Sequence, residues 1–214
     1  ALDAAEPAAR QVAERPRVAS AYQAFDLQPE IPPFMIGERL NAHGSKLFRE
    51  SLLAGDQQAI IELALQQERA GAMALDLCTA YAGRDEQADL VTLVKELRTT
   101  TRLPLMIDST SPAVLEATLP LLPGRSLVNS VNLEDGGKNL DRICPLVKRY
   151  GAAVVALTIN ERGMALTADD KVAVAKEIYQ RAVGEHGLRP GDLLFDPLTF
   201  TIGSGDATLR NSAL

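Results

Sequence analysis

The sequence predicts an α/β protein with a parallel (β/α)8 barrel, of which the first six strand–helix units are expected within its 214 residues. Short apolar segments alternate along the chain with longer segments whose apolar residues recur at helical spacing, and this order is typical of parallel strands joined by helices. Strand segments such as 153–157 are almost entirely apolar, which fits a sheet covered on both faces. No glycine-rich nucleotide fingerprint follows the first strand, which argues against a doubly wound sheet.

Composition divides the chain into two parts. Residues 1–31 are rich in alanine and proline and have no sustained apolar period, so we interpret them as a linker or N-terminal extension with a short helix around 8–14. Residues 32–214 then hold six units of about 30 residues each. Because two more units would bring the barrel near its typical size of about 250 residues, we expect a barrel whose last two units lie outside this sequence.

The first unit begins with a short predicted strand over 34–36, directly after two prolines. The helix predicted over 56–70 has an aspartate at its N-cap position and a glycine just past its end, and its apolar residues fall on one face. The next strand, over 73–75, stops at Asp76.

The remaining elements repeat this order. A helix over 85–100 with one leucine-rich face leads to a strand over 103–108. Pro112 is expected to start the next helix, over 112–122, because the first turn does not need its missing N–H. The last predicted elements are a strand over 126–128, a helix over 138–150, a strand over 152–158, a helix over 168–185 and a strand over 192–195.

Charge and composition exclude some classes of function. The net charge of -6 and the isoelectric point near 5.0 argue against a nucleic-acid partner. No apolar run reaches the 18 or more residues of a membrane span and no signal peptide is recognised, so no membrane partner and a cytoplasmic location are expected. Cys78 and Cys144 lack the spacing of a metal site or a disulfide framework, and they are interpreted as small core residues.

Polar side chains follow every predicted strand. In a parallel barrel all strands end on one face, and that face carries the chemistry. The candidate site residues at these ends are Glu38 with Asn41, Asp76, Asp108, Asn129, Asn160 and Asp196. Each unit therefore supplies a carboxylate or an amide, and none supplies a lysine or arginine at a comparable position.

Two interpretations of these residues are possible. Any one of them could simply cap a helix or satisfy loop N–H groups. As a set, however, Asp76, Asp108 and Asp196 would crowd like charges on one rim, which is costly unless a ligand rich in N–H donors is bound there. A carboxylate can accept both the ring N–H and the amino group of an aminopyrimidinone, so a planar heterocycle fits. A divalent cation is the competing interpretation, although such sites usually hold their carboxylates closer together.

Six stretches resemble the pterin-binding barrel of the methyltetrahydrofolate methyltransferases, and most closely the folate domain of the cobalamin-dependent methionine synthases. They are IGERLNAHGSK (36–46), ALDL (74–77), MIDSTSP (106–112), LVNSVNLEDG (127–136), YGAAVVALTINERG (150–163) and LLFDPLTF (193–200). The segment 18–34 resembles the linker that follows the homocysteine-binding domain in that family. The resemblance covers about residues 18–214 with the motifs in order.

The resemblance implies a role for each candidate residue. It implies pterin contacts for Asp108 and Asn129, and for Asp196 it implies acceptance of the pterin amino and N3–H groups. The other substrate-binding residues that it implies are Glu38 and Asn41 of the GERxN motif, Asp76 of the LD motif, and Asn160. No metal ligand is implied.

The resemblance also implies an activity and its partners. The domain would bind 5-methyltetrahydrofolate and present its N5-methyl to cob(I)alamin, as part of methionine synthesis from homocysteine. Cobalamin would be bound by another domain, and a homocysteine-binding domain would belong to the full-length chain. Methyl transfer also needs a hydrogen bond or a proton at N5, because the leaving group is otherwise an amide-like anion.

The sequence departs from the family pattern at two places. Cys78 stands where many relatives have Asn, and the Asn that contacts N5 belongs to a seventh strand with no counterpart here, so the catalytic residue is unknown. Two alternatives stay open. One is a dihydropteroate synthase, whose barrel uses a similar Asp, Asn and Asp trio, and the other is an inactive fragment of the methyltransferase.

Overall fold

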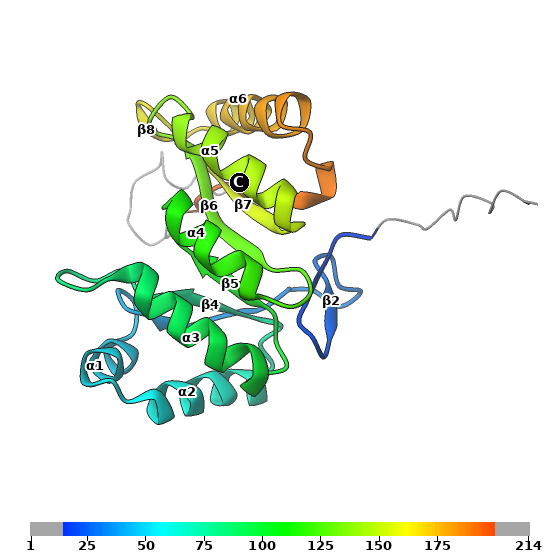
Figure 1. Ribbon diagram of the computed structural model, residues 1–214. Helices are drawn as coiled ribbons and strands as arrows, with labels where there is room; N and C mark the ends of the chain where they lie inside the picture. The colour runs from blue at the N-terminus through cyan, green and yellow to red at the C-terminus, as the bar shows by residue number, and fades with distance from the viewer. Residues whose placement is uncertain (1–14, 200–214) are drawn as a thin grey trace, which may run out of the picture.

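The computed structural model describes residues 15–199, which form a curved parallel sheet with helices on its outer side (Figure 1). In this part of the chain six parallel strands lie in the order β3-β4-β5-β6-β7-β9, and a short antiparallel strand, β8, pairs with β7. The strands are β3 (Ile36–Asn41), β4 (Ala74–Cys78), β5 (Leu105–Asp108), β6 (Leu127–Leu133), β7 (Ala153–Asn160), β8 (Gly163–Met164) and β9 (Leu193–Asp196). Among the described residues β3 and β9 form the two edges, so the sheet is a partial barrel, as the sequence predicts.

Within residues 15–199 six α-helices connect the strands, and Figure 1 shows α2 to α5 following one another along one side of the sheet. They are α1 (Lys46–Ala54), α2 (Gln57–Arg69), α3 (Glu86–Thr100), α4 (Pro112–Thr118), α5 (Lys138–Tyr150) and α6 (Ala168–Tyr179). The chain adds a 3-10 turn, η1 (Leu119–Leu121), a π-helical segment, η2 (Gln180–Glu185), and a second 3-10 turn, η3 (Pro190–Asp192). No helix in the described part is both long and apolar enough to cross a membrane.

Capping residues explain where two of the helices begin. The Asp56 carboxylate accepts a hydrogen bond from the Ala59 N–H at 3.0 Å, and Asp85 accepts one from the Ala88 N–H at 3.0 Å. Each aspartate satisfies an N–H group that has no partner inside its helix, and its negative charge suits the positive end of the helix dipole. These two helix starts agree with the prediction from the sequence.

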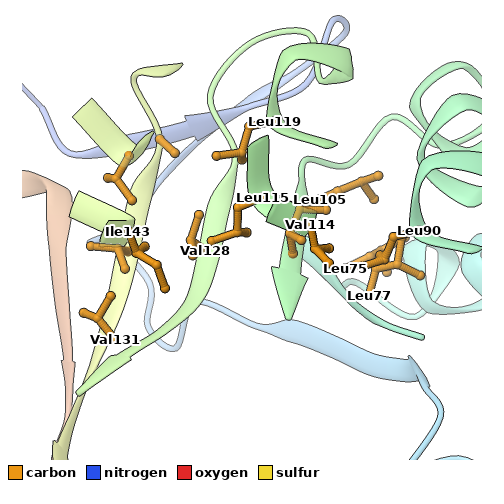
Figure 2. Close-up of a cluster of buried hydrophobic side chains, with 14 of the residues drawn as sticks. Leu75, Leu77, Leu90, Leu105, Val114, Leu115, Leu119, Val128, Val131 and Ile143 are labelled. Atoms are coloured by element: carbon orange, nitrogen blue, oxygen red, sulfur yellow. The ribbon is translucent and has the colours of Figure 1, made fainter. Parts of the chain in front are cut away.

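The main core lies between the outer face of the sheet and the helices (Figure 2). Side chains in a strand point alternately to its two faces, so Leu75 and Leu77 of β4 both face the helices. They meet Leu90 of α3, while Leu115 of α4 and Ile143 of α5 cover the strands that follow (Figure 2). Full burial of each such side chain contributes about 1.5–3 kcal/mol, so this layer holds the helices against the sheet.

A second, smaller core fills the inside of the partial barrel. Ala74, Met106, Leu127 and Ala153 come from four neighbouring strands, and all are at most 3% exposed. Val18 packs against them with no exposed surface. This layer forms an apolar floor beneath the ends of the strands.

Val18 belongs to a hairpin that the sequence analysis did not predict. Strand β1 (Arg17–Ala19) pairs antiparallel with β2 (Ala24–Asp26), and Ala19 also bridges to Arg125. This hairpin falls within residues 1–31, which were expected to be a linker or extension. The helix expected around 8–14 lies outside the described residues.

The helix predictions need three corrections. Helix α1 was not predicted, because a 9-residue helix gives too short a period to read. The helix predicted over 112–122 is α-helical only to Thr118 and then tightens into η1, which contains Pro120. The helix predicted over 168–185 is α-helical to Tyr179, and its last turn and a half is the π-helical η2.

Candidate functional site

The polar site begins with the alternation of side chains along β4. Ala74 lies in the barrel floor and Leu75 and Leu77 face the helices, so Asp76 and Cys78 point into the barrel above Ala74. Asp76 is 1% exposed. The sequence analysis predicted that β4 ends before Asp76, but the strand continues to Cys78. Asp76 is therefore a buried residue within the strand rather than a residue at its end.

Asp108 and Asn129 lie side by side in the sheet. Asp108 is the last residue of β5, as predicted, and its Cα partner on β6 is Asn129. The sequence placed Asn129 just past a strand that ends at Val128, whereas β6 runs on to Leu133 with a register irregularity after Asn129. Both residues are partly buried and follow the floor residues Met106 and Leu127 by two positions, so they share the inner face of the barrel.

Asn41, the last residue of β3, joins the carboxylates of Asp76 and Asp108. Its Nδ2 donates to Asp108 Oδ2 at 3.0 Å and to Asp76 Oδ2 at 3.3 Å. Its Oδ1 accepts from the backbone N–H groups of His43 and Gly44 at 2.9 and 3.2 Å. Because the amide oxygen is bound by the turn that follows β3, the NH2 group is held facing the carboxylates.

The charge of the two carboxylates is disfavoured where they lie. Burial and then the nearby Asp108 raise the pKa of Asp76 to about 7, and the hydrogen bonds from Asn41 and Asn129 oppose this shift. Burial also raises the pKa of Asp108, while hydrogen bonds from Cys78 and Asn41 lower it. Near neutral pH the pair therefore holds a proton for a large part of the time.

Cys78 is the residue of the site that the sequence analysis missed, because it was interpreted as a small core side chain. It is 4% exposed, and burial followed by the charge of Asp108 raises the pKa of its thiol to about 12. Cys78 is therefore a neutral thiol that hydrogen-bonds to Asp108. The period of two along β4, which places Ala74, Asp76 and Cys78 on one face, is the signal that could have identified it.

Three predicted site residues, Glu38, Asn160 and Asp196, lie apart from the polar cluster. This cluster consists of Asn41, Asp76, Cys78, Asp108 and Asn129. Glu38 is exposed on β3 and acts on the cluster through its charge, which raises the pKa values of Asp76 and Asp108. Asn160 ends β7, where its Oδ1 accepts from the Arg162 N–H at 2.9 Å in the turn to β8.

Asp196 ends β9 as predicted, and its Oδ1 accepts from the Leu198 N–H at 2.8 Å. Its Cα partner is Leu157 of β7, two residues beyond Val155, the partner of Asn129. Asp196 thus stands on the same side of the barrel one step higher than Asn129. Within residues 15–199 no group of three His, Cys, Asp or Glu side chains could hold a metal ion.

The fold and this site define a class of protein. Residues 37–214 match the family described as pterin binding enzymes, so the chain belongs to that family. It is 45% identical over 208 residues to the methionine synthase of Mycobacterium tuberculosis and 43% identical over 208 residues to that of Mycobacterium leprae. Both matches cover 96% of this chain but only 17% of the relative, so the chain spans about a sixth of their length. These findings confirm the predicted resemblance to the pterin-binding domain of methionine synthases.

Solved structures show the same fold. A dihydropteroate synthase of Xanthomonas albilineans, in complex with indole-2-carboxylic acid and 6-chloroguanine, matches with a TM-score of 0.64 at 20% identity, over 92% of this chain and 70% of its own. The Yersinia pestis enzyme with a pterine-sulfa conjugate matches with a TM-score of 0.61 at 19% identity, over 91% and 68%. At such identities the likeness confirms the predicted barrel fold and says nothing of activity.

Proposed function

We propose that the chain binds 5-methyltetrahydrofolate and presents its N5-methyl group to cob(I)alamin, as one domain of an enzyme that makes methionine from homocysteine. The observation that carries the proposal is the pairing of Asp108 with Asn129 on the inner face of the barrel, above an apolar floor. The 45% identity to a methionine synthase over 96% of the chain supports methyl transfer as the reaction.

The polar groups suit the hydrogen-bonding edge of a pterin. Asp108 and Asp196 would accept from its ring N–H and amino groups, since a carboxylate accepts two N–H bonds in one plane. Asn129 offers both a donor and an acceptor for the carbonyl and ring nitrogen atoms. Asn41 would fix the position of Asp108 through the 3.0 Å hydrogen bond that it already donates.

The remaining predicted residues would act around this contact. Asp76 lies beneath Asp108 and would shape the site through Asn41. Glu38 and Asn160 belong to the rim, where the longer parts of the folate would leave the pocket. Cobalamin, held by another domain, would supply the nucleophile that accepts the methyl group, and a homocysteine-binding domain would supply the methyl acceptor that follows.

The proposal is tested by removing the charge of Asp108. We expect Asp108→Asn to weaken the binding of 5-methyltetrahydrofolate by about 10- to 100-fold, because a hydrogen bond to a charged group contributes about 1.5–3 kcal/mol. Calorimetric titration of the protein measures this change. Glu161→Gln is the matched control, since Glu161 is an exposed carboxylate in the turn after β7 and its loss should leave the affinity within about twofold.

Equal affinities for the wild type and Asp108→Asn would contradict the proposed site, and no binding by the wild type would contradict the proposed substrate. Incubation of the protein with the pterin pyrophosphate and p-aminobenzoate tests the alternative activity, that of a dihydropteroate synthase. Formation of dihydropteroate would assign the chain to synthase chemistry instead of methyl transfer.

A further inference from the structure

One buried oxygen atom in the site has no hydrogen-bond partner. Asp76 Oδ1 is enclosed by the protein and unpartnered, while Oδ2 of the same side chain accepts from Asn41 at 3.3 Å. An ionised carboxylate in this position would leave part of its charge without any donor. A neutral carboxylic acid would leave only an unpaired polar group, which costs far less in an apolar surrounding.

The neighbouring carboxylate strengthens this argument. Asp76 and Asp108 share the one NH2 group of Asn41, so the two carboxylates are separated by a single amide nitrogen. Two carboxylates this close do not both ionise readily, and one proton stays with the pair. Asp76 is the more deeply buried of the two, because it is 1% exposed whereas Asp108 is only partly buried. The proton therefore belongs on Asp76.

The other groups that face Asp76 do not supply a compensating positive charge. Glu38 of β3 adds a further negative charge, and Cys78 of β4 is a neutral thiol. Asn129 of β6 carries no charge, and its amide only partly opposes the raised pKa of Asp76. His43, in the turn after β3, acts on Asp108 and lowers its pKa. This arrangement keeps the negative charge on Asp108 and the proton on Asp76.

We propose that Asp76 is a positioning residue beneath Asp108 that remains a carboxylic acid in the ligand complex, because a ligand covering the site makes it hold its proton more tightly. The inference rests on the proposed function, because it takes the ligand to be the folate bound at Asp108. A bound heterocycle removes water from the pocket, so ionisation of Asp76 becomes costlier in the complex than in the free protein. Binding is then linked to proton uptake.

The sign of the effect follows from this difference. The pKa of Asp76 is about 7 in the free protein. The proposal places it higher in the complex, because the ligand removes water from around the carboxyl group. At pH 6 Asp76 is protonated in both states, so binding takes up no proton there. Above pH 7 the free protein loses the proton that the complex keeps, so the affinity falls as the pH rises, by up to tenfold per pH unit.

Calorimetry with 5-methyltetrahydrofolate between pH 6 and pH 9 tests the linkage. At pH 8, titration in two buffers with different ionisation enthalpies should show uptake of a fraction of a proton by the wild type. Asp76→Asn keeps the shape and places a neutral amide there, so the ratio of its affinity to that of the wild type should rise as the pH rises from 6 to 9. It should also show no proton uptake and no loss of affinity above pH 7. A purely structural role would instead weaken Asp76→Asn equally at every pH, and that result would overturn the inference.

A second measurement does not need the folate. The infrared spectrum of the ligand-free protein should contain the carbonyl band of a protonated carboxylic acid at pH 6, which fades as the pH rises through about 7. The band should be absent from Asp76→Asn and unchanged in Asp169→Asn, an exposed carboxylate in the first turn of α6. If the wild type lacks the band, the inference fails even if folate binds. If the band is present but folate does not bind, only the proposed function fails.

Discussion

At the scale of single residues, the site depends on where a carboxylate is buried rather than on how many carboxylates the sequence contains. Asp76 is 1% exposed, whereas Asp108 is only partly buried. We infer that this difference in burial leaves the proton on Asp76 and the negative charge on Asp108. Asn41 connects them, because its oxygen is fixed by two backbone N–H groups and its NH2 group must face the pair. The same burial that prepares the site should also make the free protein less stable.

Replacement of Asp76 by asparagine should therefore stabilise the protein at alkaline pH. Because the pKa of Asp76 is about 7 in the folded state and lies near 4 in the unfolded state, folding opposes ionisation. The cost is absent below pH 4, grows as the pH rises toward 7 and stays constant above it, at up to about 4 kcal/mol. Urea unfolding should show that Asp76→Asn is more stable than the wild type at pH 8, and the difference in the free energy of unfolding should shrink toward pH 5. A difference that is independent of pH would contradict the prediction.

At the scale of elements, a clasp joins the two helices that flank the last strands. Arg181, in η2, donates from Nη2 to Asp141 Oδ2 of α5 at 2.6 Å and from Nη1 to the carbonyl of Gly136 at 2.7 Å. His186 Nε2 lies 2.9 Å from the other oxygen of Asp141. The guanidinium lies against Gly137, where a Cβ atom would come within 2.1 Å of Nη1, so only glycine leaves room for it. The clasp holds the turn between β6 and α5 in place.

Arg181→Met should test this clasp, because methionine keeps much of the apolar stem and removes the donors. We expect a loss of about 1–3 kcal/mol in the free energy of unfolding, since a partly buried carboxylate loses one of its partners. Arg149→Met is the matched control: its 3.8 Å contact with Glu116 joins two exposed side chains, and such pairs contribute about 0–1 kcal/mol. Equal losses for both variants in urea unfolding would show that the clasp does not differ from an ordinary surface ion pair.

At the scale of the whole molecule, the floor of the partial barrel is closed by a segment distant in sequence from the strands that it covers. Val18 packs on Ala74, Met106, Leu127 and Ala153, and the hairpin that carries it is also tied to the sheet by Ser20, whose Oγ donates to the carbonyl of Arg102 at 2.6 Å. The residues 17–26 therefore belong structurally to the barrel and close the end opposite the polar site.

Val18→Ala should destabilise the protein by about 1–3 kcal/mol, because it opens a cavity in a floor that cannot fully collapse. Ile31→Ala serves as the control, since Ile31 follows the hairpin but is 82% exposed, and its truncation should change the free energy of unfolding by less than about 0.5 kcal/mol. Thermal and urea unfolding measure both. If Val18→Ala lowered the free energy of unfolding as little as Ile31→Ala, the hairpin would not be part of the cooperative core.

The sequence by itself determined the alternation of strands and helices. It also determined which polar residues stand at the carboxyl ends of the strands. Apolar runs that stop at polar residues are local features, so Asp108 and Asp196 at the ends of β5 and β9 were predictable. The start of α3 at Asp85 and the span of α5 were predictable for the same reason. The sequence also carried the resemblance to the pterin-binding family, which the 37–214 match confirms.

Only the tertiary structure decided which of the polar residues meet. The ends of β3, β4 and β6 lie beyond the predicted positions, because pairing with neighbouring strands continues past the first polar residue. This pairing buries Asp76 and Cys78 inside the barrel and leaves Asn160 in a separate turn. Burial and the distance between charges are properties of the assembled sheet, so no single strand could reveal that Asp76 and Asp108 share the amide group of Asn41, from which we infer the proton on Asp76.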